Sequence, residues 1–175
     1  MQSLKALKIK QRVRVNRTMN ISIEDVKKLR KKTGAGIADC RKALGESDGD
    51  FKKAEGLLKS WGAEIASKKK DRATGQGLVE NYIHADGKVG AMVEINCETD
   101  FVGKTDEFKN LAHEVAMQIA AMDPKDVEEL SKQEYIRDSS KTIDDLVKET
   151  IAKVGENIVI RRLIRFELGG DSSEL

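Results

Sequence analysis

Residues 89–102 read VGAMVEINCETDFV and join a strand to a short polar segment. Every second residue of the first nine is apolar or small: Val89, Ala91, Val93, Ile95 and Cys97. This period of two predicts a half-buried strand with those five side chains on one face. The segment Thr99-Asp100-Phe101-Val102 follows and predicts a loop, in which Asp100 and Phe101 project outward.

The flanking segments complete an α+β core. Residues 78–84 predict a strand that pairs with 89–97 through the Asp86-Gly87 turn. A helix follows the loop, with its apolar residues at helical spacing: Phe108, Leu111, Ala112, Val115, Ile119 and Met122. Residues 125–141 are polar and are expected to form a loop with one helical turn at most. Thr142 and Asp145 then predict the start of another helix, which Gly155 ends.

Residues 158–168 predict the last strand of an antiparallel three-stranded sheet with helices. One face of this strand is expected to carry Ile158, Ile160, Ile164, Phe166 and Leu168, interrupted only by Arg162. Val159 and Leu163 are expected on the opposite face, together with Met92 of the preceding strand. Two interpretations of this second face remain open: burial in a dimer, or scattered surface hydrophobic residues.

The residues before the sheet predict three short helices. Ser22 and Asp25 form a capping signal ahead of Ile23, Val26 and Leu29, which share one face. After the Gly34-Ala35-Gly36 turn, a second helix is expected to bury Ile37, Cys40 and Leu44, and Asp50 caps a third. Three helices separated by glycine turns favour a compact bundle. The run Lys68-Lys69-Lys70 opens a polar stretch, read as a solvated linker or as a contact for RNA or an acidic partner.

The composition of the 175 residues favours a globular protein with a densely charged surface, since 35% are charged. A net charge of only +2 argues against a dedicated nucleic-acid site. No apolar run reaches the roughly 20 residues that a membrane helix needs. Cys40 and Cys97 are expected to be free thiols. Residues 1–18 are basic, which favours a disordered extension ahead of a natural start at Met19, with a transit-peptide remnant as the alternative.

No catalytic or metal site is expected. Gly103-Lys104-Thr105 resembles the end of a phosphate-binding loop, but Glu98 occupies the position of its first glycine. His84 and His113 lack metal-ligand spacing, and no nucleophile–base pair can be assembled, so neither an enzyme nor a cofactor is expected. Asp100 and Phe101 would present unlike contacts to a partner. The alternative is that Phe101 packs on the helix that follows the loop.

Three blocks resemble signatures of the elongation factor Ts family, in the family's order. The first combines residues 28–30, 33–36 and 39–44, and the second is residues 94–102. The third combines Gly155-Glu156-Asn157-Ile158 with residues 161–162 and 165–168. The resemblance implies an amino-terminal ubiquitin-associated-like bundle followed by the α+β core. It also implies a guanine-nucleotide exchange factor that promotes GDP release from elongation factor Tu.

The resemblance implies a role for particular residues. In the family, the aspartate and phenylalanine of the second signature wedge between helices of the elongation factor Tu nucleotide domain and disturb its magnesium and phosphate site. The matching residues here are Asp100 and Phe101, within Thr99 to Val102. The bundle contacts the same domain, and its matching positions are Arg30, Ile37, Ala38 and Arg41. Many relatives have two methionines at the Ile37-Ala38 positions, so the contact here stays apolar but is smaller.

The short core resembles family members that form homodimers. Some of these have a cysteine where this chain has Leu163, so any dimer here is expected to be non-covalent. The expected organisation is an extension (1–19), a bundle (20–67), a linker (68–77), a core and dimerisation domain (78–170) and a disordered tail (171–175). The expected location is the cytoplasm, or an organelle if residues 1–18 are a targeting remnant. An adaptor for another partner and an RNA-associated protein are the competing functions.

Overall fold

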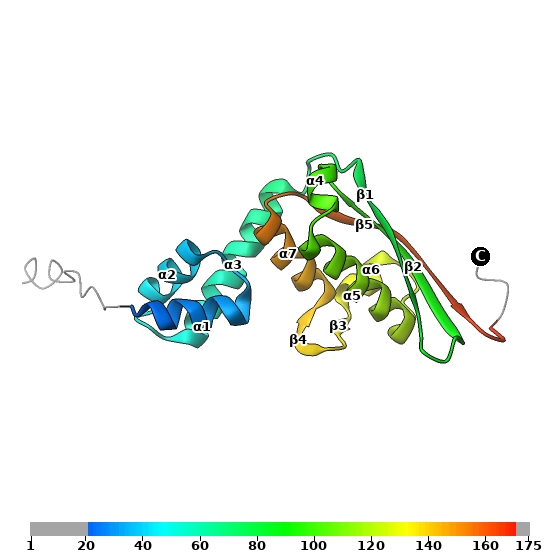
Figure 1. The fold of residues 1–175 in the computed structure, drawn as a ribbon, viewed down its shortest axis with the longest axis horizontal. Helices are drawn as coiled ribbons and strands as arrows, with labels where there is room; N and C mark the ends of the chain where they lie inside the picture. Colours follow the sequence, from blue (N-terminus) through cyan, green and yellow to red (C-terminus); the bar gives the residue numbers. More distant parts are fainter. Residues whose placement is uncertain (1–20, 171–175) are drawn as a thin grey trace, which may run out of the picture. The chain divides into compact units, whose positions relative to one another are not determined.

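The computed structural model describes residues 21–170. The predicted extension and tail therefore lie outside the described residues. The chain divides into two compact units, residues 1–58 and residues 59–175, called here the amino-terminal unit and the core unit. Figure 1 labels their helices and strands.

The amino-terminal unit contains α1 (Ile23–Thr33), α2 (Ile37–Glu46) and the first part of α3 (Phe51–Lys69). The predicted cap is confirmed, because the Asp25 N–H donates to the Ser22 hydroxyl at 3.0 Å. Gly34 ends α1 in the left-handed region at φ 68°. The three predicted helices are therefore present, and the core between them contains Val26, Leu29, Cys40, Ala43, Leu44 and Ala54.

Two predicted core residues of this unit are exposed. Ile23 and Ile37 expose 74% and 59% of their surface. Each is the first residue of its helix, and a helical side chain covers the turn that precedes its own Cα. Their side chains therefore extend beyond the helix end, and helical spacing alone placed them wrongly in the core.

The predicted linker, residues 68–77, is partly helix and partly strand. Helix α3 continues to Lys69, and the first strand begins at Gln76. Of residues 68–77, only 70–75 therefore lie outside helices and strands. The boundaries of the predicted domains remain a prediction.

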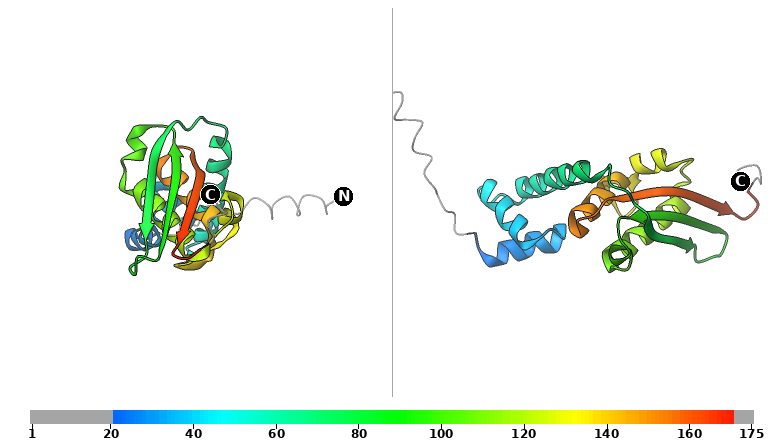
Figure 2. Two further views of the ribbon diagram at one scale, coloured as in Figure 1. Left: turned by 90° about the vertical axis from the view of Figure 1, so that its right-hand side faces the viewer. Right: turned by 90° about the horizontal axis from the view of Figure 1, so that it is seen from above.

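The core unit is built on an antiparallel sheet of β1 (Gln76–Ile83), β2 (Val89–Cys97) and β5 (Ile158–Glu167), with β2 in the middle. The inner face of β2 is buried as predicted, and Ile95 and Cys97 have no exposed surface. Helix α5 (Asp106–Met122) packs on that face, and α7 (Ile143–Val154) packs on α5. In the left view of Figure 2 the strands of the core unit face the viewer, and the helices of that unit lie behind them. The α+β fold class is thus confirmed, with helices on one face of the sheet.

A β-bulge in β5 overturns the predicted faces of that strand. Glu94 lies opposite Arg162 while the next residue, Ile95, lies opposite Ile160, so Arg161 is an extra residue in the ladder. One extra residue reverses the direction of every side chain beyond it. Leu163 therefore packs against the core rather than on the outer face as predicted. Phe166 lies on the outer face, not on that of Ile158 and Ile160.

Residues 125–141 are not the predicted loop. They contain α6 (Val127–Lys132), β3 (Glu134–Tyr135) and most of β4 (Asp138–Thr142). The fully buried Gln118 side chain of α5 donates to the Glu134 carbonyl at 3.0 Å and accepts from the Ile136 N–H at 3.0 Å. Strands β3 and β4 pair with each other as a hairpin. Because hydrogen bonds to α5 hold this hairpin, its sequence shows little apolar periodicity. The helix predicted from Thr142 and Asp145 is confirmed, with both hydrogen bonds of a capping box.

Gly77 is a position where the fold requires glycine. Its φ is 147°, and an added Cβ would lie 2.1 Å from the Ile95 carbonyl oxygen. We expect Gly77→Ala to lower the free energy of unfolding by about 3 kcal/mol, since strained backbone and a clash with the neighbouring strand add. Urea denaturation measures this. Gly75→Ala is the control, since an added Cβ there meets nothing within 4 Å; equal losses for both variants would contradict the prediction.

Candidate functional site

The segment predicted as a loop after β2 is a short helix. Here α4 (Asp100–Gly103) begins after Thr99, whose hydroxyl accepts from the Val102 N–H at 3.5 Å. We call residues 99–103 the Asp–Phe turn. In Figure 1 it lies at the end of β2, before α5. Thr99 at the N-cap is the sequence signal for such a turn, because its side chain can accept from the first helical N–H groups.

The side chains of the Asp–Phe turn point in opposite directions. Phe101 exposes 79% of its surface, whereas Val102 exposes 8% and belongs to the hydrophobic core. The interpretation that Phe101 packs on the following helix is therefore wrong, and Val102 is the residue that anchors the turn. An aromatic ring held outward on an anchored turn is the kind of side chain that serves as an interface anchor.

Asp100 is exposed beside Phe101. Its carboxylate accepts a hydrogen bond from the Lys104 ammonium at 2.6 Å. This bond and the positive charge of Lys104 lower the pKa of the Asp100 carboxyl below its usual value. The turn therefore presents an ionised carboxylate next to an apolar ring at neutral pH.

Glu156 is a contact of this turn that sequence reasoning did not single out as a site residue. It lies between α7 and β5, and both of its carboxylate oxygens accept hydrogen bonds from Thr99. The two residues are 57 positions apart. No spacing within the sequence indicates this pair, although Glu156 lies in the third family signature.

The four residues assigned to the amino-terminal unit are all exposed. Ile37, Ala38 and Arg41 lie on the first turns of α2, and Arg30 lies near the end of α1. Ile37 and Arg41 are four residues apart, so they lie on one face of the helix. The exposed Ile37 therefore gives this face of α2 an apolar side chain next to the Arg41 guanidinium.

Residues 21–170 contain no cluster of histidine, cysteine and acidic side chains suited to a metal ion. Cys40 and Cys97 are buried free thiols, and burial raises the pKa of both. No helix in the same range is long and apolar enough to span a membrane.

Comparison with known proteins places the chain in a family. The family model described as elongation factor TS matches residues 98–174, which include the Asp–Phe turn and Glu156. A protein of Thermoanaerobacter sp. (strain X514) named elongation factor Ts is 45% identical over 194 residues, covering 85% of this chain and 95% of the relative. The chain belongs to the elongation factor Ts family.

Further relatives carry the same name. The elongation factor Ts of Coprothermobacter proteolyticus is 44% identical over 196 residues, covering 86% of this chain and all of the relative. That of Nostoc sp. is 49% identical over 148 residues, which is 85% of this chain but 47% of the relative. The resemblance drawn from the three blocks is therefore confirmed, and membership of the family assigns the chain to translation elongation.

Proposed function

We propose that this protein is a guanine-nucleotide exchange factor that promotes GDP release from elongation factor Tu through Asp100 and Phe101. The observation that carries the proposal is the exposure of Phe101, 79% on a turn whose next residue is buried. Thr99 and Val102 hold the two ends of the pair, so the ring and the carboxylate can enter a partner without refolding of the turn. Family membership supports the choice of partner.

In the proposed action, this chain and GDP compete for elongation factor Tu, because the chain binds the nucleotide-free state more tightly than the GDP-bound state. Elongation factor Tu would hold GDP through magnesium and a phosphate-binding loop, as nucleotide-binding proteins of that class do. A partner that binds the nucleotide-free state more tightly must weaken nucleotide binding by the same factor. Insertion of Phe101 between helices near the phosphates, with the Asp100 carboxylate beside the magnesium site, supplies that preference. The factor needs no nucleophile or cofactor for this role.

The amino-terminal unit supplies a second contact in this proposal. Arg30 and Arg41 are exposed cations, and Ile37 and Ala38 are exposed apolar residues between them in the chain. Their contact with the nucleotide domain would add binding energy that does not depend on the state of the nucleotide. Such uniform binding lowers the concentration needed for exchange, whereas the Asp–Phe turn sets the maximal rate.

The experiment is a stopped-flow assay of fluorescent GDP release from elongation factor Tu. We expect the release rate to rise with the concentration of the chain and to reach a plateau. Excess magnesium should reduce the stimulation, since it opposes disturbance of the magnesium site. A release rate that is independent of the chain's concentration would overturn the proposal.

We further propose that the protein is a non-covalent homodimer that pairs through the outer face of its sheet. Helices cover the inner face, and the outer face carries exposed apolar side chains on all three strands: Val79, Ile83, Met92 and Phe166. These side chains lie in neighbouring rows across the sheet. In one row Met92 lies between Asn81 and Ile164, and in the next Gly90 lies between Ile83 and Phe166. Apolar faces of this kind mark protein–protein contacts.

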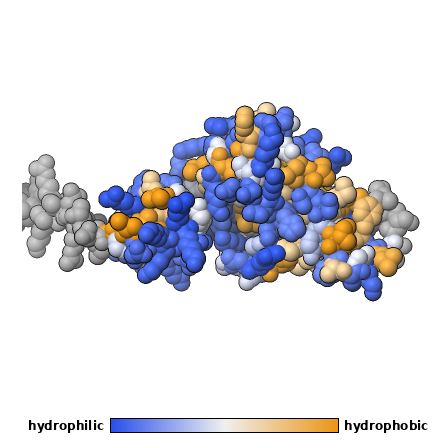
Figure 3. Space-filling view, in the orientation of Figure 1, coloured by the Kyte–Doolittle hydropathy of each residue, from blue (hydrophilic) through white to orange (hydrophobic). Residues whose placement is uncertain are grey.

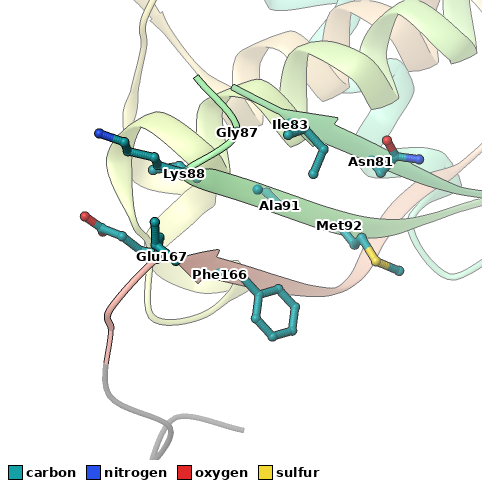
Figure 4. A pocket seen from close by; sticks show the side chains of 11 residues that line it. Asn81, Ile83, Gly87, Lys88, Ala91, Met92, Phe166 and Glu167 are labelled. Carbon is teal, nitrogen blue, oxygen red and sulfur yellow. The ribbon is translucent and has the colours of Figure 1, made fainter. Parts of the chain in front are cut away.

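The outer face is hollowed at Gly90. The Ile83 side chain lies across this glycine, where an added Cβ would be 2.7 Å from its Cδ1. Figure 4 shows Ile83, Met92 and Phe166 along a groove formed by the three strands. Figure 3 views the sheet from its edge, and hydrophobic residues lie along the right-hand side of the core unit, among other apolar patches on its surface. A second copy of the same face would fill the groove with identical apolar side chains.

A further inference from the structure

Both carboxylate oxygens of Glu156 accept hydrogen bonds from a single residue, Thr99. The Thr99 backbone N–H donates to Oε2 at 2.9 Å, and the Thr99 hydroxyl donates to Oε1 at 2.6 Å. Hydrogen bonds to an ionised acceptor are shorter and stronger than neutral ones. Two of them on one residue fix both its backbone and its side-chain torsion.

Thr99 in turn fixes the start of α4. Its hydroxyl donates to Glu156 and accepts from the Val102 N–H, so it connects the carboxylate to the first turn of the helix. A helix of four residues is too short to be stable without such contacts, because nucleation is unfavourable. We call the two hydrogen bonds between Glu156 and Thr99 the clamp. The exposed pair Asp100-Phe101 lies in the chain between the clamped Thr99 and the buried Val102. The direction of Phe101 is therefore set by Thr99 on one side and by Val102 on the other.

The turn that carries Glu156 is itself fixed. Its neighbour Asn157 is buried, and the Asn157 N–H donates to a carboxylate oxygen of Glu98 at 2.6 Å. The Asn157 amide also donates to the carbonyls of Lys70 and Arg72, at 3.2 Å and 2.9 Å. The residue next to Glu156 is thus held by three hydrogen bonds at a buried position, which restricts the backbone that carries the Glu156 carboxylate.

We propose that Glu156 is a positioning residue for nucleotide exchange, which acts through Thr99 to hold Phe101 and Asp100 in the orientation that enters the partner. This inference rests on the proposed exchange function. A turn held in its bound orientation loses less conformational freedom on binding, so more of the contact energy remains for displacing the nucleotide. Without the clamp, the same side chains would be present but would sample several orientations.

The first test measures the turn in the protein alone, by NMR amide hydrogen exchange. In Glu156→Ala we expect the amides of Thr99 and Val102 to exchange at least about tenfold faster, as loss of a charge-assisted hydrogen bond implies. The amides in the middle of α5 should keep the protection they have in the wild type. Unchanged protection of residues 99 and 102 would overturn the inference, whatever the protein does with elongation factor Tu.

The second test measures stimulated GDP release at a series of concentrations. Glu156→Ala should lower the plateau rate about tenfold, while the half-saturating concentration changes less than about threefold. Glu156→Gln keeps the side-chain length and one acceptor oxygen, so it should recover part of the rate. Glu149→Gln is the matched control, because it weakens a carboxylate contact with Lys141 at 2.8 Å elsewhere in the core unit.

A double-variant cycle separates positioning from general stability. If Glu156 acts through Phe101, Glu156→Ala should cause little further loss of rate in a Phe101→Ala background. Equal losses in both backgrounds would overturn the inference. A wild-type chain that fails to stimulate release would instead reject the exchange function itself, and the amide measurement would still report on the clamp.

Discussion

Replacing Phe101 with alanine is expected to lower the maximal rate of stimulated GDP release by about 30-fold, the effect of losing an interface anchor worth ~2 kcal/mol. The ring exposes 79% of its surface, so it contributes little to the fold and is available to a partner. Its truncation should change the free energy of unfolding by less than about 0.5 kcal/mol. Stopped-flow release of fluorescent GDP and urea denaturation measure the two effects.

Two further variants define what the assay reports. Phe101→Leu keeps an apolar side chain and should retain part of the stimulation. Ile136→Ala is the control, because Ile136 is another exposed apolar residue of the core unit, at 42%, outside the Asp–Phe turn. Unchanged stimulation by Phe101→Ala, or equal losses in Phe101→Ala and Ile136→Ala, would remove Phe101 from the proposed mechanism.

Replacing Met92 with aspartate is expected to dissociate the proposed homodimer. Met92 lies on the central strand between Asn81 and Ile164 and exposes 45% of its surface. In the dimer, an unpaired carboxylate there would be buried, at a cost of about 3–5 kcal/mol. The dimer should therefore weaken by a factor of at least about 100. Sedimentation velocity over a range of concentrations measures the change.

The chain offers a closely matched control for this variant. Met122 exposes 48% of its surface at the end of α5, away from the outer face of the sheet. Met122→Asp introduces the same charge at a similar exposure and should leave the association unchanged. A wild-type chain that sediments as a monomer at every concentration would refute the dimer, and so would a Met92→Asp variant that associates as strongly as Met122→Asp.

The elements that sequence reasoning predicted well are those defined by neighbouring residues. The inner face of β2 follows from alternation: Ala91, Val93, Ile95 and Cys97 are buried as predicted, and Val89 is half-buried. The start of α7 follows from the Thr142 and Asp145 capping pair, and its end from Gly155 in the left-handed region at φ 78°. These signals extend over a few residues, so they do not depend on where the rest of the chain lies.

The errors have a different origin. The faces of β5 depend on an extra residue opposite Glu94 and Ile95, which no pattern within residues 158–168 reveals. The β3–β4 hairpin depends on hydrogen bonds from Gln118, a residue in another element. In both cases the deciding partner is distant in the sequence.

The candidate site also has features that neighbouring residues predict and features that depend on distant partners. The sequence by itself determined the family, through three blocks in order, and it identified Asp100 and Phe101 as the residues to consider. It left the direction of Phe101 undecided between a partner contact and packing on the next helix. Only the tertiary structure decided this, because exposure depends on the whole surroundings of a side chain. The burial of Val102 and the bonds from Thr99 to Glu156, 57 residues away, leave Phe101 outside the core.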